Sequence, residues 1–143
     1  MTIEQNKALV RKFEDFINAK DLDAALALFS PDFVDHTPPV GLPPGIEGVR
    51  MFFTMQFAAF PDSHTTSLDM IAEGDKVVHR MNGAGTHQGM FLGMAPTGKH
   101  ITWSFIDIWR VAGGKLAEHW VEADMLGMMQ QLGLMPPPPN PTH

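Results

Sequence analysis

The chain is 143 residues long, carries a formal net charge of -6 and contains no cysteine. This length suits a single domain with a sizeable core. The acidic balance, with a pI near 5.5, gives no basic surface for nucleic acid or an anionic membrane, so a neutral or weakly charged small molecule is the expected partner. The absence of cysteine excludes disulfides and thiol chemistry.

The N-terminal stretch MTIEQNKALVRKF is charged and amphipathic, and no run of about 18 apolar residues occurs in the chain. We therefore expect a cytoplasmic protein that does not enter a membrane. The seven histidines show neither the HExxH pattern nor another compact ligand spacing, so no metal site is expected.

Three helices are predicted in the first half of the chain. Thr2 caps the first, which continues to about Ala19 because apolar residues recur at helical spacing. The second follows Asp21 and runs through Phe29, stopping before Pro31 because a residue ahead of proline avoids helical angles. The third covers residues 46–60. Residues 32–37 are predicted to be extended, and the proline-rich residues 38–45 to form a loop.

Strands follow in the second half. Residues 65–73 and 76–87 flank a turn, and a loop over 88–98 leads to two strands that meet at a Gly-rich hairpin turn, residues 112–115. A short helix is predicted at 125–132. This order predicts one α+β domain over residues 1–134, with helices packed on a strongly curved antiparallel sheet and a short edge strand near Phe33. Residues 135–143 are predicted to be a disordered, proline-rich tail.

The hairpin combines large rings with carboxylates. If Val111 pairs with Leu116, strict alternation gathers on one face Trp103, Phe105, Asp107, Trp109, Glu118, Trp120, Glu122 and Asp124. His119 would then lie on the opposite face. A carboxyl group among indole rings loses hydration, which raises its pKa toward the range of general acid/base chemistry. The alternative is an open sheet face with solvated or paired carboxylates, which suits Asp107 least because apolar residues flank it.

A series of short phrases resembles a known family. They are Phe33-Val34-Asp35-His36, Ala59-Phe60-Pro61-Asp62, Ala72-Glu73-Gly74-Asp75-Lys76-Val77-Val78, Gly85-Thr86-His87-Gln88-Gly89, Pro96-Thr97-Gly98, Asp107-Ile108-Trp109-Arg110, and Gly114-Lys115 through Glu118-His119-Trp120 to Asp124. In this order they resemble the SnoaL-like polyketide cyclase, or ester cyclase, family of the nuclear transport factor 2-like superfamily, over about residues 5–133.

The resemblance implies a cone-shaped α+β barrel with a deep pocket and, commonly, a homodimer through the outer sheet face. In the characterised cyclases an aspartate near the end of the last strand is the general acid/base of an intramolecular aldol closure, without metal or cofactor. Asp124 is the position that matches best, and Asp107 is the second candidate. We leave the choice between them open.

An aldol closure needs a base, a place for enolate charge and a proton for the new alkoxide. His36 and His87 are the predicted donors beside the two aspartates. The residues predicted to line the substrate site are Trp103, Phe105, Trp109, Trp120, Asn82, Gln56, Phe53 and Met90. Each histidine has a structural alternative, because His36 could cap the loop at Pro38 and His87 could fix the turn after its strand. His119 is expected to be structural or at a dimer contact.

The prediction is thus a cofactor-independent enzyme that acts on an apolar, carbonyl-bearing small molecule by cyclisation or a related enol proton transfer. One alternative is a ligand-binding or association module of the same fold, which the many methionines would suit. A weaker alternative is an epoxide hydrolase, for which Arg80-Met81-Asn82 has an asparagine where an acid is needed. The absence of tyrosine disfavours chemistry like that of steroid isomerase or scytalone dehydratase.

Overall fold

A curved five-stranded sheet forms the frame of the computed structural model, which describes residues 1–139. Residues 140–143, the end of the predicted disordered tail, lie outside the described residues. The strands lie side by side in the order β1-β5-β4-β3-β2. Their bounds are β1 (Phe29–Asp35), β2 (His64–Glu73), β3 (Lys76–Thr86), β4 (His100–Ala112) and β5 (Lys115–Ala123). Only β1 and β5 pair in parallel, so the fold is α+β with a mixed sheet.

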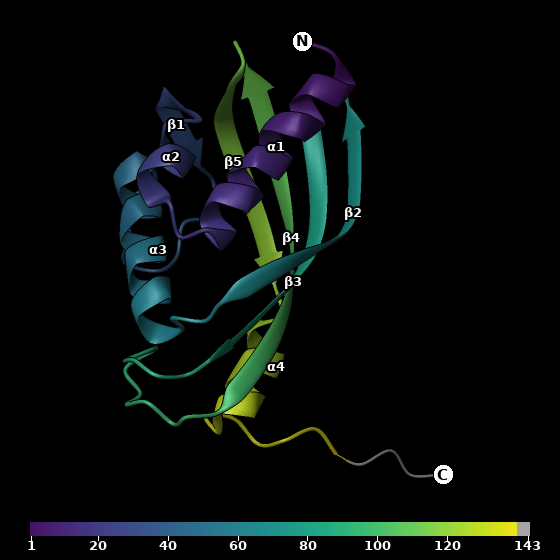
Figure 1. Ribbon diagram of the computed structural model, residues 1–143. Coiled ribbons are helices and arrows are strands. Elements are labelled where there is room, and N and C mark those ends of the chain that lie inside the picture. Colours follow the sequence, from purple (N-terminus) through teal and green to yellow (C-terminus); the bar gives the residue numbers. More distant parts are fainter. Residues whose placement is uncertain (140–143) are drawn as a thin grey trace.

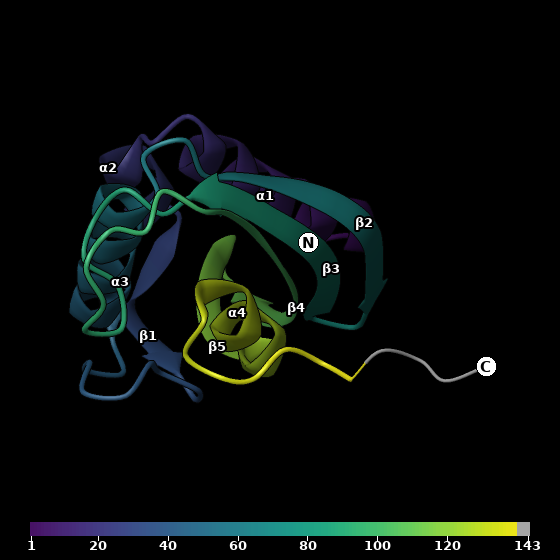
Figure 2. The same cartoon turned by 90° about the horizontal axis from the view of Figure 1, so that it is seen from below.

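Three helices cover one face of this sheet, as Figure 1 shows; they are α1 (Ile3–Asn18), α2 (Leu22–Leu26) and α3 (Ile46–Ala59). The fourth, α4 (Met125–Leu132), lies at the lower end of the sheet, in the middle of the view in Figure 2. A capping box of Thr2 and Gln5 starts α1, and the Asp124 side chain caps α4. None of the helices in the described part of the chain has the length and apolar content needed to span a bilayer.

The second helix is shorter than predicted. It ends at Leu26, and Phe29 begins β1 instead of closing the helix. The reason is tertiary, because Phe29 is buried edge-to-face against Phe13 and Trp109. The Leu116 N–H also donates to the Leu28 carbonyl, which draws the chain onto β5. Core packing therefore overrides the local helical pattern here.

The core lies between the helices and the inner face of the sheet. Its main cluster joins Val10, Phe13 and Ile17 of α1 to Trp109 of β4 and other buried residues. A second, smaller cluster lies toward the lower end and contains Ala59, Phe60, Ile101, Met128 and Leu132. Along β3 and β4, odd-numbered side chains point inward and even-numbered ones point outward, as the alternating burial shows.

A β-bulge in β5 changes the predicted hairpin register. Val111 pairs with Leu116 as predicted, but the next position, Arg110, pairs with Glu118, which leaves Ala117 as an extra residue. A bulge inserts one residue into one strand and thereby exchanges the faces of everything beyond it. The predicted pairs from Trp109 onward are therefore wrong by one residue.

The shift decides which side chains of β5 face the core. Trp109 pairs with His119 instead of the predicted Glu118. Asp107 pairs with Val121 instead of the predicted Trp120. His119 and Val121 consequently lie on the inner face with Asp107. Glu118, Trp120 and Glu122 lie on the outer face, contrary to the prediction.

Candidate active site

A cluster of three ionisable side chains lies on the inner face of the sheet. Asp35, His119 and Asp107 come from the neighbouring strands β1, β5 and β4. Nε2 of His119 lies 2.7 Å from Oδ1 of Asp107, and Nδ1 lies 3.2 Å from Oδ1 of Asp35. All three side chains are nearly buried, with at most 12% of their surface exposed. The imidazole therefore bridges two carboxylates inside the protein.

His119 is a cation in this arrangement. A carboxylate can only accept a hydrogen bond, so each ring nitrogen of His119 donates one. Burial by itself lowers the pKa of His119, but the charges and hydrogen bonds of Asp107 and Asp35 outweigh burial and raise this pKa to about 9. The indole of Trp109 lies beside the imidazole, with ring centres 4.2 Å apart. At neutral pH His119 thus keeps its proton and orients the carboxylates rather than acting as a base.

Asp35 is held in place from several directions. Burial raises the pKa of Asp35, but its contacts with His119 and Thr37 lower it overall. The Thr37 N–H donates to Asp35 Oδ1 at 3.0 Å, and Thr37 Oγ1 accepts from the Val121 N–H at 2.8 Å. The Asp35 N–H donates to the Pro44 carbonyl at 2.7 Å. The proline-rich loop is therefore anchored next to the cluster.

Asp107 has one oxygen that remains free. Its Oδ1 accepts from His119, and no hydrogen bond within the described chain reaches Oδ2. Oδ2 is also not sealed from solvent, since the fully buried side-chain polar atoms without a partner are Asn6 Oδ1, His79 Nδ1 and His87 Nε2. Phe105 and Trp109 flank Asp107 at alternate positions of the same strand face. A carboxylate fixed through one oxygen and open at the other is suited to accept a proton.

A neutral histidine borders Asp107 on the other side. His79 of β3 is the cross-strand partner of Asp107, and its Nε2 lies 2.7 Å from Ser67 Oγ and 3.9 Å from Glu14 Oε2. Burial lowers the pKa of His79. Burial also raises the pKa of Glu14, with the negative charge of Asp15 as the next cause. The inner face thus carries a continuous band of polar groups from α1 to β1.

Comparison with known proteins identifies the family. The family model for the SnoaL-like polyketide cyclases matches residues 7–132. The chain belongs to this family. DnrD of Streptomyces peucetius, named aklanonic acid methyl ester cyclase, is 25% identical over 137 residues, which cover 92% of this chain and 93% of DnrD.

Solved structures agree with that assignment. AclR of Streptomyces galilaeus, for which a hydroxylase role has been suggested, superimposes with a TM-score of 0.89 at 29% identity, covering 97% of this chain and 87% of AclR. IdmH of Streptomyces antibioticus, for which polyketide cyclase activity has been suggested, superimposes with a TM-score of 0.78 at 32% identity, covering 90% of this chain and 99% of IdmH. The relatives place this SnoaL-like protein among cyclase-type enzymes.

The structure separates His36 and Trp120 from Asp107. In this SnoaL-like chain both side chains lie on the outer face, where their rings stack with centres 4.7 Å apart. Nε2 of His36 lies 2.8 Å from Glu118 Oε1, and Glu118 also accepts from Arg110. Trp120 does not reach the inner cluster because of the bulge at Ala117, and His36 does not reach it because it alternates with Asp35, which points inward.

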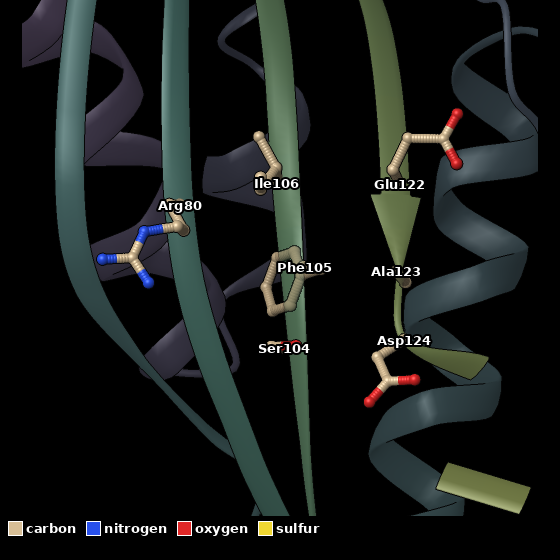
Figure 3. A pocket seen from close by; sticks show the side chains of 7 residues that line it. All are labelled: Arg80, Ser104, Phe105, Ile106, Glu122, Ala123 and Asp124. Carbon is tan, nitrogen blue, oxygen red and sulfur yellow. The ribbon is translucent and has the colours of Figure 1, made fainter. Parts of the chain in front are cut away.

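Asp124 also lies away from Asp107. It is exposed, and its side chain accepts from the Gly127 N–H at the start of α4. It borders a shallow outer depression with Arg80, Ser104, Phe105, Ile106, Glu122 and Ala123, shown in Figure 3 with the helices behind the sheet. The structure therefore gives Asp124 a capping role and does not bring the two aspartates together.

Asn82 is another predicted substrate contact on the outer face. It pairs with Ser104 across β3 and β4 and is exposed. Arg80 points outward as well and forms an ion pair with Asp69. The side chains of Arg80 and Asn82 consequently face away from the interior, whereas Met81 between them points inward, which removes the basis for the epoxide hydrolase alternative.

The remaining predicted wall residues lie on the inner side or at the rim. Trp103 and Phe105 are half-buried on the inner face of β4, and Phe53 of α3 packs against the main core cluster. Gln56 of α3 is half-buried, whereas Met90 is exposed on the loop after β3. His87 is fully buried, but it lies in the lower cluster, with its ring centre 5.7 Å from that of Phe60.

The sequence did not identify His119 and Asp35 as site residues. Its predicted register places His119 on the outer face because no glycine or proline marks the bulge. Asp35 belongs to the phrase Phe33-Val34-Asp35-His36 of the family resemblance, but the sequence alone assigns it no role. The structure pairs Asp35 with His119 across β1 and β5, and no local sequence signal sets this register. No group of three or more His, Asp or Glu side chains among residues 1–139 is arranged so that it could hold a metal ion.

Proposed function

We propose that this SnoaL-like protein catalyses an intramolecular aldol cyclisation with Asp107 as the general acid/base. The substrate is an apolar molecule that carries an acidic C–H between carbonyl groups and a ketone within reach of that carbon. DnrD, which is named for the cyclisation of a methyl ester, supports this substrate class. No metal or cofactor takes part in the proposed reaction.

The reaction balances with one carboxylate. Oδ2 of Asp107 removes the α-proton, and the resulting enolate carbon forms a bond to the ketone carbon. The ketone oxygen becomes an alkoxide and takes the proton back from Asp107, which leaves an alcohol and restores the carboxylate. His119 and Asp35 are positioning residues, because the imidazolium fixes Oδ1 of Asp107 and Asp35 fixes the imidazolium.

The observation that carries the proposal is the free Oδ2 of a buried carboxylate whose other oxygen is held at 2.7 Å by His119. This geometry fixes a proton acceptor on the inner face of the sheet and limits its rotation. Phe105 and Trp103, at alternate positions further along β4, offer apolar surface for a ligand that reaches Asp107. The exposed carboxylate of Asp124 lacks both features.

The decisive experiment compares Asp107→Asn with Asp124→Asn, using aklanonic acid methyl ester and a panel of β-keto esters. Turnover is followed by chromatography, and exchange of the acidic α-hydrogen with D2O is followed by NMR. We expect Asp107→Asn to lose at least about 100-fold in both rates, the scale typical of general acid/base catalysis. Asp124→Asn is the matched control and should keep wild-type rates.

Two outcomes would reject the proposal. If Asp107→Asn keeps both rates while Asp124→Asn loses them, the acid/base lies on the outer side of the sheet. If the wild-type protein binds the esters but neither cyclises them nor exchanges their α-hydrogen, the chain is a binding module of the same fold.

We also propose that the protein forms a homodimer through the outer sheet face. Ile71, Val78, Ile108 and Trp120 are successive cross-strand partners on that face and form an apolar row across four strands. Ile71 is 65% exposed in the single chain. Burial of such a row against the same row of a second copy would remove apolar surface from water on both sides.

A further inference from the structure

The orientation of the His87 imidazole is fixed by its neighbours. The Thr97 N–H donates to Nδ1 at 3.2 Å, and Thr97 Oγ1 lies 2.9 Å from the same atom. Nδ1 is therefore the acceptor, which assigns the ring hydrogen to Nε2. The His87 N–H also donates to the Lys99 carbonyl, and the Gly98 N–H donates to the His87 carbonyl. Both the backbone and the ring of His87 are thus held in position.

The resulting Nε2–H group has no acceptor. The His87 side chain is fully buried, and Nε2 is one of the sealed polar atoms that lack a hydrogen-bond partner. Polar groups buried in this way are destabilising, so native proteins nearly always pair them. A pinned donor without an acceptor indicates that the acceptor comes from outside the chain.

Aromatic rings surround this donor. The ring centre of His87 is 5.7 Å from that of Phe60 and 6.4 Å from that of Phe91. Phe60 lies in turn 5.4 Å from Trp103, again between ring centres. We call Phe60, Phe91 and Trp103 the aromatic box. Its surfaces suit a flat, apolar ligand that carries a hydrogen-bond acceptor.

One wall of the aromatic box belongs to a tight turn. Phe91 and Met94 bond each other through both backbone N–H groups, and the two residues between them, Leu92 and Gly93, have φ of 51° and 74°. Leu92 is 51% exposed, and a side chain other than glycine is strained in this left-handed region. Phe91 is only half-buried whereas His87 is fully buried, so this wall of the aromatic box is nearer to solvent than the donor. Displacement of Phe91 would open the aromatic box to a ligand.

We propose that the Nε2–H of His87 binds the carbonyl oxygen of an apolar ligand, in a subsite formed by the aromatic box. Trp103 precedes Asp107 by four residues on the same face of β4, so the subsite lies about 13 Å from the Asp107 position. The inference rests on the proposed function only in taking the ligand to carry a carbonyl group. Its role is binding of the part of the ligand that does not react.

The test uses two probes of the same shape, 2-acetylnaphthalene and 2-isopropenylnaphthalene, which differ by a carbonyl oxygen in place of a CH2 group. Dissociation constants are measured by tryptophan fluorescence for the wild-type protein and for His87→Phe. We expect the preference for the ketone to fall by about 3- to 10-fold in His87→Phe, the scale of one neutral hydrogen bond. His64→Phe is the matched control, since it makes the same substitution at an exposed histidine of β2 outside the aromatic box and should keep the preference.

A spectroscopic measurement keeps the test valid if His87→Phe does not fold. The carbonyl stretch of 13C-labelled 2-acetylnaphthalene bound to the wild-type protein should lie at lower frequency than in hexane. A stretch at the hexane frequency, equal preferences in wild type and His87→Phe, or no binding of either probe up to its solubility limit would each overturn the inference. Asp107→Asn should keep the ketone preference, so failure of the subsite is distinguishable from failure of the acid/base assignment.

Discussion

His119 donates a hydrogen bond from Nε2 to Oδ1 of Asp107 at 2.7 Å, from the neighbouring strand β5. Because both side chains are nearly buried and Asp35 bonds the other ring nitrogen, the imidazolium forms one charged unit with its two partners. Removal of His119 would leave two buried carboxylates without their cation, and removal of either aspartate would leave one ring N–H of the imidazolium without its acceptor. Stability and activity should therefore depend on the same three groups.

The first prediction concerns the pH dependence of stability. The pKa of His119 is raised from 6.5 to about 9 by Asp107 and Asp35, which outweigh burial. A raised pKa means that the folded state binds the proton more tightly, so this stabilisation is complete below about pH 6.5 and is lost as the pH rises through 9. The free energy of unfolding, measured with urea, should fall over this window by at most about 3 kcal/mol.

His119→Gln is the control for that measurement. This variant should be less stable at pH 6.5 by about 3 kcal/mol, because two buried carboxylates lose their cation. Its unfolding free energy should change little between pH 6.5 and 9. If the wild-type and variant curves run parallel, His119 does not titrate with the assigned pKa.

Long, periodic elements could be predicted from sequence. The predicted first and third helices and the 125–132 helix agree with α1, α3 and α4, because apolar spacing and proline stops define them locally. The four strands and the edge strand near Phe33 also occur. These features depend on patterns within one segment.

Of the three residues in the inner cluster, the sequence predicted a site role only for Asp107, on β4. Asp107 was singled out from its apolar neighbours on β4, but its partner His119 lies beyond Ala117, the extra residue of the bulge. Alanine fits either sheet face, so nothing local marks the shift. The faces of β5 are set by pairing with β4 and β1, which one sequence does not reveal.

The second prediction concerns His36. Because its ring lies on the outer face and bonds Glu118, His36→Ala should leave cyclase turnover at the wild-type level. The loss of this partly exposed, solvent-screened pair should change the free energy of unfolding only slightly. His119→Gln, assayed in parallel, should lose turnover by about 100-fold. A comparable loss in His36→Ala would mean that the outer face takes part in the chemistry.

The third prediction concerns the close contact between Gly83 and Trp103. A Cβ atom at Gly83 would lie 2.3 Å from the indole ring, so Gly83→Ala forces Trp103 to move. We expect a loss of about 1–3 kcal/mol in urea unfolding and a changed near-ultraviolet circular dichroism spectrum. Asn82→Ala, on the neighbouring outward position, should stay within about 0.5 kcal/mol of wild type. An unchanged spectrum for Gly83→Ala would contradict the packing described.

The last prediction concerns the proposed dimer. Sedimentation equilibrium of the wild-type protein should give twice the chain mass of 15.8 kDa. Ile71→Lys and Ile108→Lys place a charge on the apolar row of the outer face, where Ile71 is 65% exposed and Ile108 is half-buried in the single chain. A lysine buried at the contact without a partner is costly, so both variants should be monomers.

Val40→Lys is the matched control, because Val40 is fully exposed on the proline-rich loop, away from the sheet. This variant should remain a dimer. Circular dichroism should show that all three variants keep the fold, since none of the altered side chains belongs to the core clusters. A wild-type protein that sediments at the single-chain mass at every concentration, or lysine variants that stay dimeric, would exclude the outer face as the contact.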